Sequence, residues 1–158
     1  MSIKDYEEAK DLMKEDPKTY HLGPHSDELI HVAEKKLGIK FRGIYRDFLK
    51  EYGIVSTYGH QVYGITSDKF ENDAVPNAVW LTLLERKTID LPNNLFIIYE
   101  DDFGDYYYCM DFNQGSEVDV EPKVVAYPAG VGIDWPQKTV AEDFGQFLKG
   151  LILDTIEL

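Results

Sequence analysis

A stretch of acidic residues between Lys87 and Lys123 carries the side chains of this sequence that could do specific chemistry. No lysine or arginine lies between these two positions, whereas nine carboxylates do. The nine are Asp90, Glu100, Asp101, Asp102, Asp105, Asp111, Glu117, Asp119 and Glu121. The formal net charge of the whole chain is −13 at pH 7, so most of the charge imbalance lies in less than a quarter of its length.

Aromatic residues are interspersed with these acids. They are Phe96, Tyr99, Phe103, Tyr106, Tyr107, Tyr108 and Phe112. Carboxylates steer a positively charged protein toward the surface that carries them, and aromatic rings anchor a contact once water is excluded. This combination favours binding to a basic protein surface. The simpler alternative is an acidic segment that only keeps the protein in solution.

Metal binding is the next chemistry to consider. His21 and His25 have the spacing of two zinc ligands on a helix, but Gly23 and Pro24 between them disfavour that helix. Residues 100–105 carry closely spaced carboxylates, yet their glycine is misplaced for a calcium-binding EF-hand loop. We therefore expect no metal site and no cofactor. Weak association of divalent ions with so many carboxylates stays open.

Catalysis finds little support in the sequence. A carboxylate pair acting as acid and base needs one member whose pKa is raised by burial, and we expect these acids in loops and at exposed strand positions. Cys109 lies in an apolar segment with no histidine or basic residue beside it, which favours a buried, unreactive thiol. The nucleophile elbow, dinucleotide fingerprint and P-loop motifs are absent. We predict no catalytic residues and a binding protein rather than an enzyme.

Length and composition indicate one folded domain. The chain has 158 residues, of which 44% are apolar and 13% aromatic, enough for one sizeable core. A pI near 4.6 disfavours nucleic acid and anionic membranes as ligands, because phosphate contacts need clustered lysines and arginines. The N-terminus turns polar at once and the longest apolar runs are about five residues, so we expect neither a signal peptide nor a membrane span. With Cys109 as its single cysteine, the chain is predicted to be cytoplasmic.

Helical periodicity dominates the first half of the chain. An apolar stripe near the N-terminus predicts a helix that must end before Pro17. Ser26 is a suitable N-cap for a second helix, which Gly38 would end. The apolar face of residues 44–52 predicts a third helix, with Gly53 as its left-handed end.

Strand signals follow in the second half. Residues 61–65 are rich in β-formers, and Pro76 is expected at the first turn of a fourth helix. The apolar runs 95–99 and 106–110 flank residues 100–105, which predicts a β-hairpin whose loop is acidic.

Acid and valine alternate over residues 117–121. This alternation predicts a solvent-facing strand in which the valines point inward and the acids outward. The inward pair is Val118 and Val120, and the outward acids are Glu117, Asp119 and Glu121.

A further strand and a helix complete the predicted fold. Residues 123–127 form an apolar run suited to a strand. Thr139 followed by Glu142 matches a capping box in front of the last apolar helical face. The order of these elements predicts an α+β fold, a single domain with a mainly antiparallel sheet flanked by helices.

Four segments carry a family resemblance. They are residues 34–53, which include YRDFLKEYG at 45–53; residues 62–65 (VYGI); the hairpin with LPNNLFI at 91–97 and YCMD at 108–111; and residues 141–148 (AEDFGQFL). In this order they resemble the SUKH superfamily, the Smi/Knr homology domain, over about residues 26–152. We accordingly divide the chain into an N-terminal helix and connector, residues 1–25, and a SUKH-like domain, residues 26–158. Arg42 stands where the family usually has proline, so the helix that follows must begin by other means.

The resemblance implies an α+β domain without catalytic residues. In bacteria it implies most often an immunity protein that binds and neutralises a toxin domain, frequently a nuclease; a regulatory scaffold or protein-interaction module without a toxin partner is the alternative. Because a nuclease domain tends to be basic, the expected partner is a basic toxin protein. The predicted partner-binding residues are Glu100, Asp101, Asp102, Phe103, Asp105, Tyr107, Glu117, Asp119 and Glu121.

Overall fold

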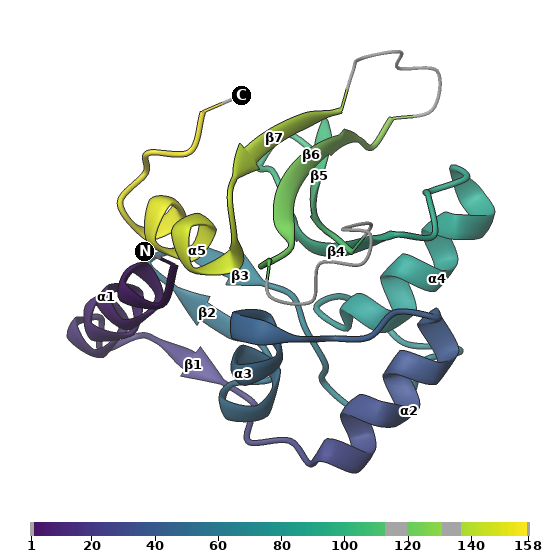
Figure 1. Cartoon of the computed structure of the whole chain (residues 1–158), viewed down its shortest axis with the longest axis horizontal. Helices are drawn as coiled ribbons and strands as arrows, with labels where there is room; N and C mark the ends of the chain where they lie inside the picture. Colours follow the sequence, from purple (N-terminus) through teal and green to yellow (C-terminus); the bar gives the residue numbers. More distant parts are fainter. Residues whose placement is uncertain (1, 113–119, 131–136, 158) are drawn as a thin grey trace.

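The structure is a computed structural model that describes residues 2–112, 120–130 and 137–157. Within these residues the chain folds, as expected, as one α+β domain (Figure 1). It has five helices and two antiparallel sheets, where one sheet was expected. The helices are α1 (Ser2–Glu15), α2 (Asp27–Leu37), α3 (Gly43–Glu51), α4 (Ala78–Thr88) and α5 (Phe144–Ile152).

The strands form a small sheet and a larger one. They are β1 (Tyr20–His21), β2 (Val55–Thr57), β3 (His60–Val62), β4 (Leu95–Glu100), β5 (Tyr106–Asp111), β6 (Lys123–Pro128) and β7 (Lys138–Ala141). The small sheet has the order β1-β2-β3 and the larger one β4-β5-β6-β7. The predicted hairpin is confirmed as β4 and β5.

A backbone hydrogen bond at a bulge in the edge strand β4 connects the two sheets. The register shifts between Ile97 and Tyr99, and the carbonyl of Ile98 accepts a hydrogen bond of 2.7 Å from the backbone N–H of Tyr63. The neighbouring N–H of Ile97 donates to Thr82 Oγ1 on α4, at 3.0 Å. These two bonds use polar groups on the outer edge of β4, so they oppose pairing with another strand there.

Helices cover both faces of the larger sheet, with α4 on one side and α5 on the other (Figure 1). Successive residues of a strand point to opposite faces, as Tyr107 and Tyr108 do. The hydroxyl of Tyr107 donates to Glu85 on α4, at 2.9 Å. The ring of Tyr108 lies 5.6 Å from that of Phe147 on α5, measured between centroids. The β4–β5 hairpin is therefore held between two helices.

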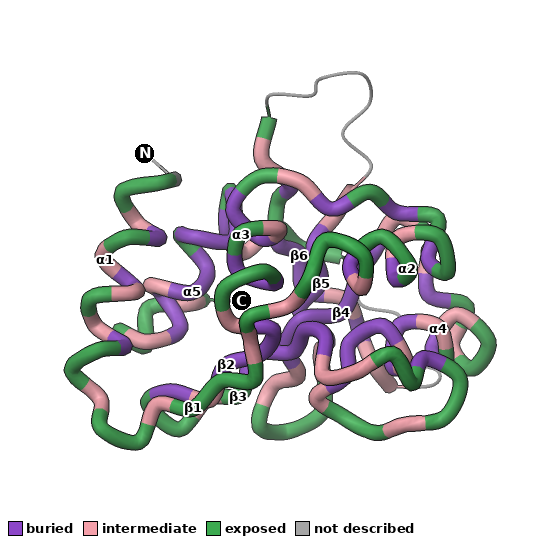
Figure 2. The backbone as a smooth tube through the Cα atoms, turned by 90° about the horizontal axis from the view of Figure 1, so that it is seen from below, coloured by how far each residue is buried: buried purple, intermediate pink, exposed green. Residues whose placement is uncertain are grey.

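The centre of the core is a cluster of aromatic rings from α3, α5 and β4. Tyr45 and Phe48 each pack against Phe144, with ring centroids 4.9 Å and 4.8 Å apart. Phe96 contacts Phe41 at 4.9 Å. In Figure 2, buried backbone runs through β4 and β5 in the middle of the molecule. The family-like segment of residues 45–53 thus contributes two of the central rings.

The N-terminal helix belongs to the same packed body. Figure 1 shows α1 beside α5, and Tyr6 on α1 is buried against Phe144. Lys149 on α5 reaches back to α1, where its Nζ lies 3.3 Å from Asp5 Oδ1 and 2.5 Å from Glu8 Oε2. Elements from the two ends of the chain therefore pack together.

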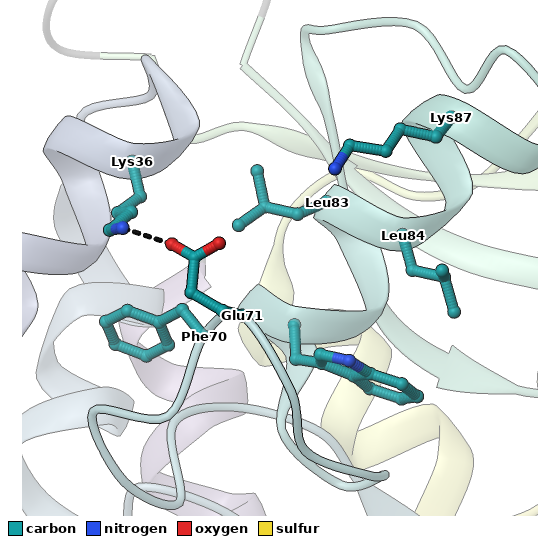
Figure 3. A pocket seen from close by; sticks show the side chains of 7 residues that line it. Lys36, Phe70, Glu71, Leu83, Leu84 and Lys87 are labelled. Carbon is teal, nitrogen blue, oxygen red and sulfur yellow. Dashed lines mark hydrogen bonds and ion pairs between the residues drawn. The ribbon is translucent and has the colours of Figure 1, made fainter.

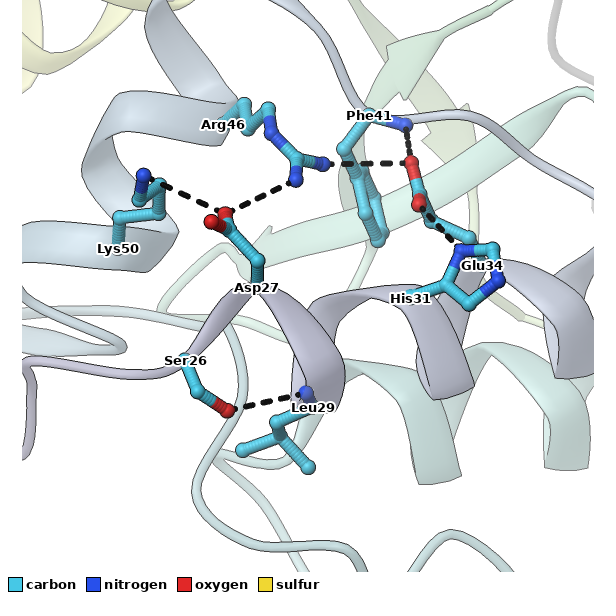
Figure 4. Close-up of polar contacts among 8 residues, drawn as sticks. All are labelled: Ser26, Asp27, Leu29, His31, Glu34, Phe41, Arg46 and Lys50. Carbon is cyan, nitrogen blue, oxygen red and sulfur yellow. Dashed lines mark hydrogen bonds and ion pairs between the residues drawn. The ribbon is translucent and has the colours of Figure 1, made fainter.

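Ion pairs fasten α2 to α3, as Figure 4 shows. The guanidinium of Arg46 lies 3.2 Å from Asp27 and 3.5 Å from Glu34. Glu34 also accepts a hydrogen bond of 2.7 Å from the backbone N–H of Phe41. The hydrogen bond from Lys50, aided by its charge and by Arg46, lowers the pKa of Asp27. These contacts fix the loop between the two helices.

The first three helices lie where their sequence signals predict. Ser26 Oγ accepts a hydrogen bond from the backbone N–H of Leu29, and Gly38 ends α2 with a φ of 68°. Gly53, just past α3, has a φ of 74°. A strand, β1, lies within the segment expected to be only a connector, because it pairs with β2.

The fourth helix begins later than expected. The proline predicted in its first turn, Pro76, lies before the helix and uses its carbonyl to accept a hydrogen bond from Gly64 N–H. Asn77 is the N-cap instead, and its Oδ1 accepts from the backbone N–H of Trp80 at 3.4 Å. Pro76 therefore bonds to Gly64 of another segment, although the local sequence predicted it in the first turn of the helix.

The capping box predicted at Thr139 is wrong. Thr139 lies in β7 and pairs with Val125 of β6, so its backbone is extended. Asp143 caps α5, accepting at 2.9 Å from the N–H of Gln146, whose side chain in turn accepts from Glu142 N–H. A reciprocal pair of hydrogen bonds similar to a capping box therefore forms at Asp143, four residues after the predicted position.

Replacing Tyr45 by phenylalanine tests how the core is built. The Tyr45 hydroxyl is buried and donates a hydrogen bond of 2.9 Å to the carbonyl of Tyr63. Tyr45→Phe leaves that carbonyl without this donor, so we expect a loss of about 1–2 kcal/mol in the free energy of unfolding. Urea denaturation measures it, with the exposed Tyr20→Phe as control. Equal losses in both variants would contradict the assignment.

Candidate partner-binding surface

The acidic loop of residues 101–105 connects β4 to β5 and is closed by its first residue. The backbone N–H of Asp101 donates to the carbonyl of Tyr106 at 3.2 Å, while Asp101 Oδ1 accepts from Tyr106 N–H at 3.0 Å. Gly104 donates to the carbonyl of Asp101 and has a φ of 71°. Asp101 therefore holds the turn as well as adding charge to it.

Three side chains of this loop face solvent. Asp102 and Asp105 are exposed, and Phe103 is 88% exposed. Burial of a phenylalanine is worth about 2 kcal/mol, which Phe103 does not gain within the fold. The loop thus presents one large apolar ring between two carboxylates.

The ion pairs of the described residues lie away from this loop. They join acids and bases of α1, α2, α3 and α5, link Lys36 to Glu71, and link Lys123 to Glu142. Within the part of the chain that the structure describes, none of them includes a carboxylate of residues 100–105. The negative charge of the loop is therefore not neutralised by these ion pairs.

A hollow of about 270 Å³ lies between the loop and the segment after α5; we call it the hairpin hollow. Its lining residues are His60, Tyr99, Asp101, Asp102, Phe103, Tyr108, Leu151, Asp154 and Ile156. The rings of Tyr99 and Tyr108 lie 5.6 Å apart, and the Tyr99 hydroxyl is 2.8 Å from His60 Nδ1. Aromatic rings, aliphatic side chains and carboxylates thus meet in one depression.

The negative charge of the loop affects the pKa values of the two tyrosines that line this hollow. Burial, followed by the negative charge of Asp102 and other nearby groups including Asp101, raises the pKa of Tyr99 to about 12. Burial and the same two aspartates also raise the pKa of Tyr108. Both tyrosines therefore keep their protons at neutral pH, and the hollow combines neutral rings with anionic neighbours.

A second hollow, of about 200 Å³, lies between α2 and α4 and differs in character (Figure 3). Its lining includes Trp80, Leu84 and two lysines, Lys36 and Lys87. Lys36 pairs with Glu71 across it. The basic side chains there contrast with the acidic rim of the hairpin hollow.

Comparison with known protein families identifies the family of this chain. The SUKH_6 family model, described as SMI1-KNR4 cell-wall, matches residues 27–148. The chain belongs to this family of the SUKH superfamily. No curated protein matches it. The matched range begins at α2 and ends within α5, so it contains the hairpin, and membership indicates an immunity-type or Smi1/Knr4-like protein.

Glu121 has a different place in this SUKH domain from the one predicted. We expected it to point outward from a strand; instead it is half-buried, and its Oε1 accepts a hydrogen bond of 3.1 Å from the backbone N–H of Ile44. Arg42, the local N-cap, gives α3 no side-chain hydrogen bond. Glu121 caps the helix in its stead, which explains how α3 begins without the proline usual in the family.

Val120 is the other described residue of the strand predicted at residues 117–121. Val120, expected to point inward, is 39% exposed, and neither Val120 nor Glu121 lies in a strand. Glu117 and Asp119 lie outside the described residues. At Val120 and Glu121, alternation of acid and valine did not predict the orientation, because Glu121 is held by a partner 77 positions away in the sequence.

Tyr107, which we predicted as a partner-binding residue, is buried and does not lie at the surface. Its ring is buried on the α4 face of the hairpin, where its hydroxyl binds Glu85. Glu100 is half-buried, and burial raises its pKa, with further contributions from the charges of Asp101 and Glu85. The structure therefore separates Tyr107 and Glu121 from the exposed residues of the loop.

Six residues of the hollow are absent from the predicted partner-binding set: Tyr99, Tyr108, His60, Leu151, Asp154 and Ile156. Tyr99 and Tyr108 belong to the hairpin itself. By contrast, His60 stands alone in the sequence, Leu151 lies in the last helix, and Asp154 and Ile156 follow it. No local pattern connects them with the hairpin, because they meet it only through packing of α5 and β3.

The residues considered for metal binding and for thiol chemistry have other contacts in the fold. His25 Nε2 is 2.5 Å from the carbonyl of Ile65, and the His21 ring lies edge-on to Tyr52. Across the described residues, no group of three or more possible metal ligands comes together. Burial raises the pKa of the Cys109 thiol.

Within the described residues, every helix is too short or too polar to cross a membrane.

Substitution of Glu121 tests its capping role. Glu121→Ala removes the acceptor for Ile44 N–H, so we expect the free energy of unfolding to fall by about 1 kcal/mol. Glu121→Gln keeps an acceptor oxygen and should lose less. Chemical denaturation of both variants measures the difference, and an alanine variant as stable as the wild type would contradict the cap.

Glu121 should also affect how stability depends on pH. Burial raises its pKa in the folded protein above the ordinary value of 4.5. As pH rises, the unfolded chain therefore loses this proton first, and the folded state loses stability until its own carboxyl has ionised. Relative to Glu121→Gln, we expect the stability of the wild type to decrease between pH 4 and pH 7 in urea titrations. A constant or opposite difference would contradict this sign.

Proposed function

We propose that this SUKH protein is an immunity protein that binds a basic toxin domain, such as a nuclease, and neutralises it through the acidic hairpin loop. The observation that carries the proposal is a hydrogen-bonded hairpin loop that exposes Asp102, Phe103 and Asp105. Among the described residues, no lysine or arginine forms an ion pair with it. Family membership supports the immunity class.

Electrostatics supports the choice of partner. A nuclease must bind a polyanion and therefore carries lysines and arginines around its substrate groove. A protein with a net charge of −13 associates with such a groove rapidly and would cover the surface that nucleic acid needs. The same proposal places the protein in the cytoplasm, where a nuclease would meet its substrate.

Phe103 provides the apolar component of this contact. Binding energy at protein interfaces is concentrated in a few aromatic or arginine anchors, and charged rims mainly raise the association rate. An 88% exposed ring between two carboxylates fits the anchor role. The working set is thus Asp102, Phe103 and Asp105 with Asp101, whereas Tyr107 and Glu121 serve the fold.

A protein-interaction module without a toxin partner is the second candidate. The description of the matching family, SMI1-KNR4 cell-wall, favours it. The two candidates differ in one outcome: only an immunity protein protects a cell that expresses the toxin.

Charge reversal in the loop tests the proposal. We choose Asp102→Lys with Asp105→Lys, because Asp101 closes the turn and is best left intact. Against the product of the neighbouring reading frame, we expect affinity at low salt to fall at least about tenfold, with a shallower salt dependence and weaker rescue from toxicity.

The matched control is Glu28→Lys with Asp68→Lys, two exposed acids outside the hairpin. It changes the net charge equally and should reduce affinity much less. Equal effects in both double variants would show that only overall charge matters. Unchanged binding and protection in the loop variant would contradict the loop contact, and failure of the wild type to protect would contradict the immunity function.

A further inference from the structure

We propose that the hairpin hollow receives the guanidinium group of an arginine side chain from the partner. This inference rests on the proposed function and names the contact by which the basic protein is recognised. The hollow is formed by the hairpin, by His60 of β3 and by the segment that follows α5, so only the folded chain presents it.

The charge of the lining selects a cation. Three carboxylates, those of Asp101, Asp102 and Asp154, lie around the hollow, and its described lining contains no lysine or arginine. Asp102 and Asp154 are exposed, and neither forms an ion pair within the described part of the chain. A cation can therefore pair with these carboxylates without breaking an existing ion pair. An anion would be repelled by them.

The aromatic floor selects a planar cation. The rings of Tyr99 and Tyr108 lie 5.6 Å apart with an angle of 54° between them, and Phe147 packs behind Tyr108. His60 Nδ1 is hydrogen-bonded to the Tyr99 hydroxyl, which restrains that ring. A guanidinium group stacks on aromatic faces and pairs side-on with a carboxylate, whereas the ammonium group of lysine is a strongly hydrated point charge. Arginine thus fits the combination better than lysine does.

The apolar part of the rim suits the stem of the same side chain. Leu151 and Ile156 line the hollow on one side and Phe103 on the other. An arginine buries its methylene groups along apolar surface while its head reaches charged groups. Phe103, exposed in the free protein, would gain contacts with that stem.

A titration with small probes tests the site in the full-length chain. Arginine amide, lysine amide and citrulline amide, the last a neutral isostere of arginine, are added to ¹⁵N-labelled protein and followed by NMR. We expect arginine amide to shift the signals of residues 99–103 and 151–156 in a saturable way, with a dissociation constant of about 1–10 mM. Lysine amide should bind more weakly, and citrulline amide should leave these signals unchanged.

Neutral substitutions locate the binding. Asp102→Asn with Asp154→Asn keeps side-chain size, and asparagine tolerates the φ of 58° at position 154. This double variant should bind arginine amide about fivefold more weakly, whereas Glu28→Gln with Asp68→Asn, which removes the same charge elsewhere, should bind as the wild type does. Equal affinity in both variants, shifts spread over all acidic segments, or equal binding of lysine amide would overturn the inference.

The two proposals fail in different ways. If arginine amide does not bind in the hollow while the wild type still neutralises the toxin, the arginine site is wrong and the immunity function stands. If arginine amide binds as expected while no toxin is bound or neutralised, the immunity function is wrong and the site remains a receptor for an arginine of another basic protein.

Discussion

Aromatic packing between α3, α5 and β4 holds the other elements in place. Phe144 touches both Tyr45 and Phe48, and Phe96 carries the cluster into the larger sheet through Phe41. Because α5 is fixed there, Phe147 can support Tyr108 from behind, and the residues after α5 come to lie beside the hairpin. Loss of these ring contacts would separate the two walls of the hairpin hollow. The proposed recognition surface is therefore a consequence of the core rather than an addition to it.

Gathering like charges on one loop costs free energy, since the carboxylates repel one another and none of them forms an ion pair within the described residues. The hairpin tolerates this cost because both of its faces are packed and its outer edge is bonded to Thr82 and Tyr63. A loop anchored in this way is pre-organised, so a partner has little conformational entropy to remove on binding. In the folded chain Phe103 is exposed to water.

The acids of one stretch of sequence serve different purposes once the chain has folded. Asp101 closes a turn, Glu121 caps α3, and Glu100 lies half-buried near Glu85. Among the described acids of the stretch, Asp90, Asp102 and Asp105 have the plain exposure that a count of charges would assign to all of them. A dense acidic segment therefore indicates a candidate binding surface, and hydrogen bonds within the fold decide which of its carboxylates stay exposed to solvent.

Local signals in the sequence determined the ends of α2 at Ser26 and Gly38, the β4–β5 hairpin, and the projection of Tyr107 and Tyr108 to opposite faces. Each of these depends on backbone geometry within a few residues, so spacing alone carries the information. Tertiary structure decided that Thr139 continues a strand, that Tyr107 is buried, that Glu121 caps a helix 77 positions away, and that His60 and Asp154 join the hairpin. The physical reason is that a polar or aromatic side chain takes the partner that packing brings to it, and distance along the sequence does not measure that proximity.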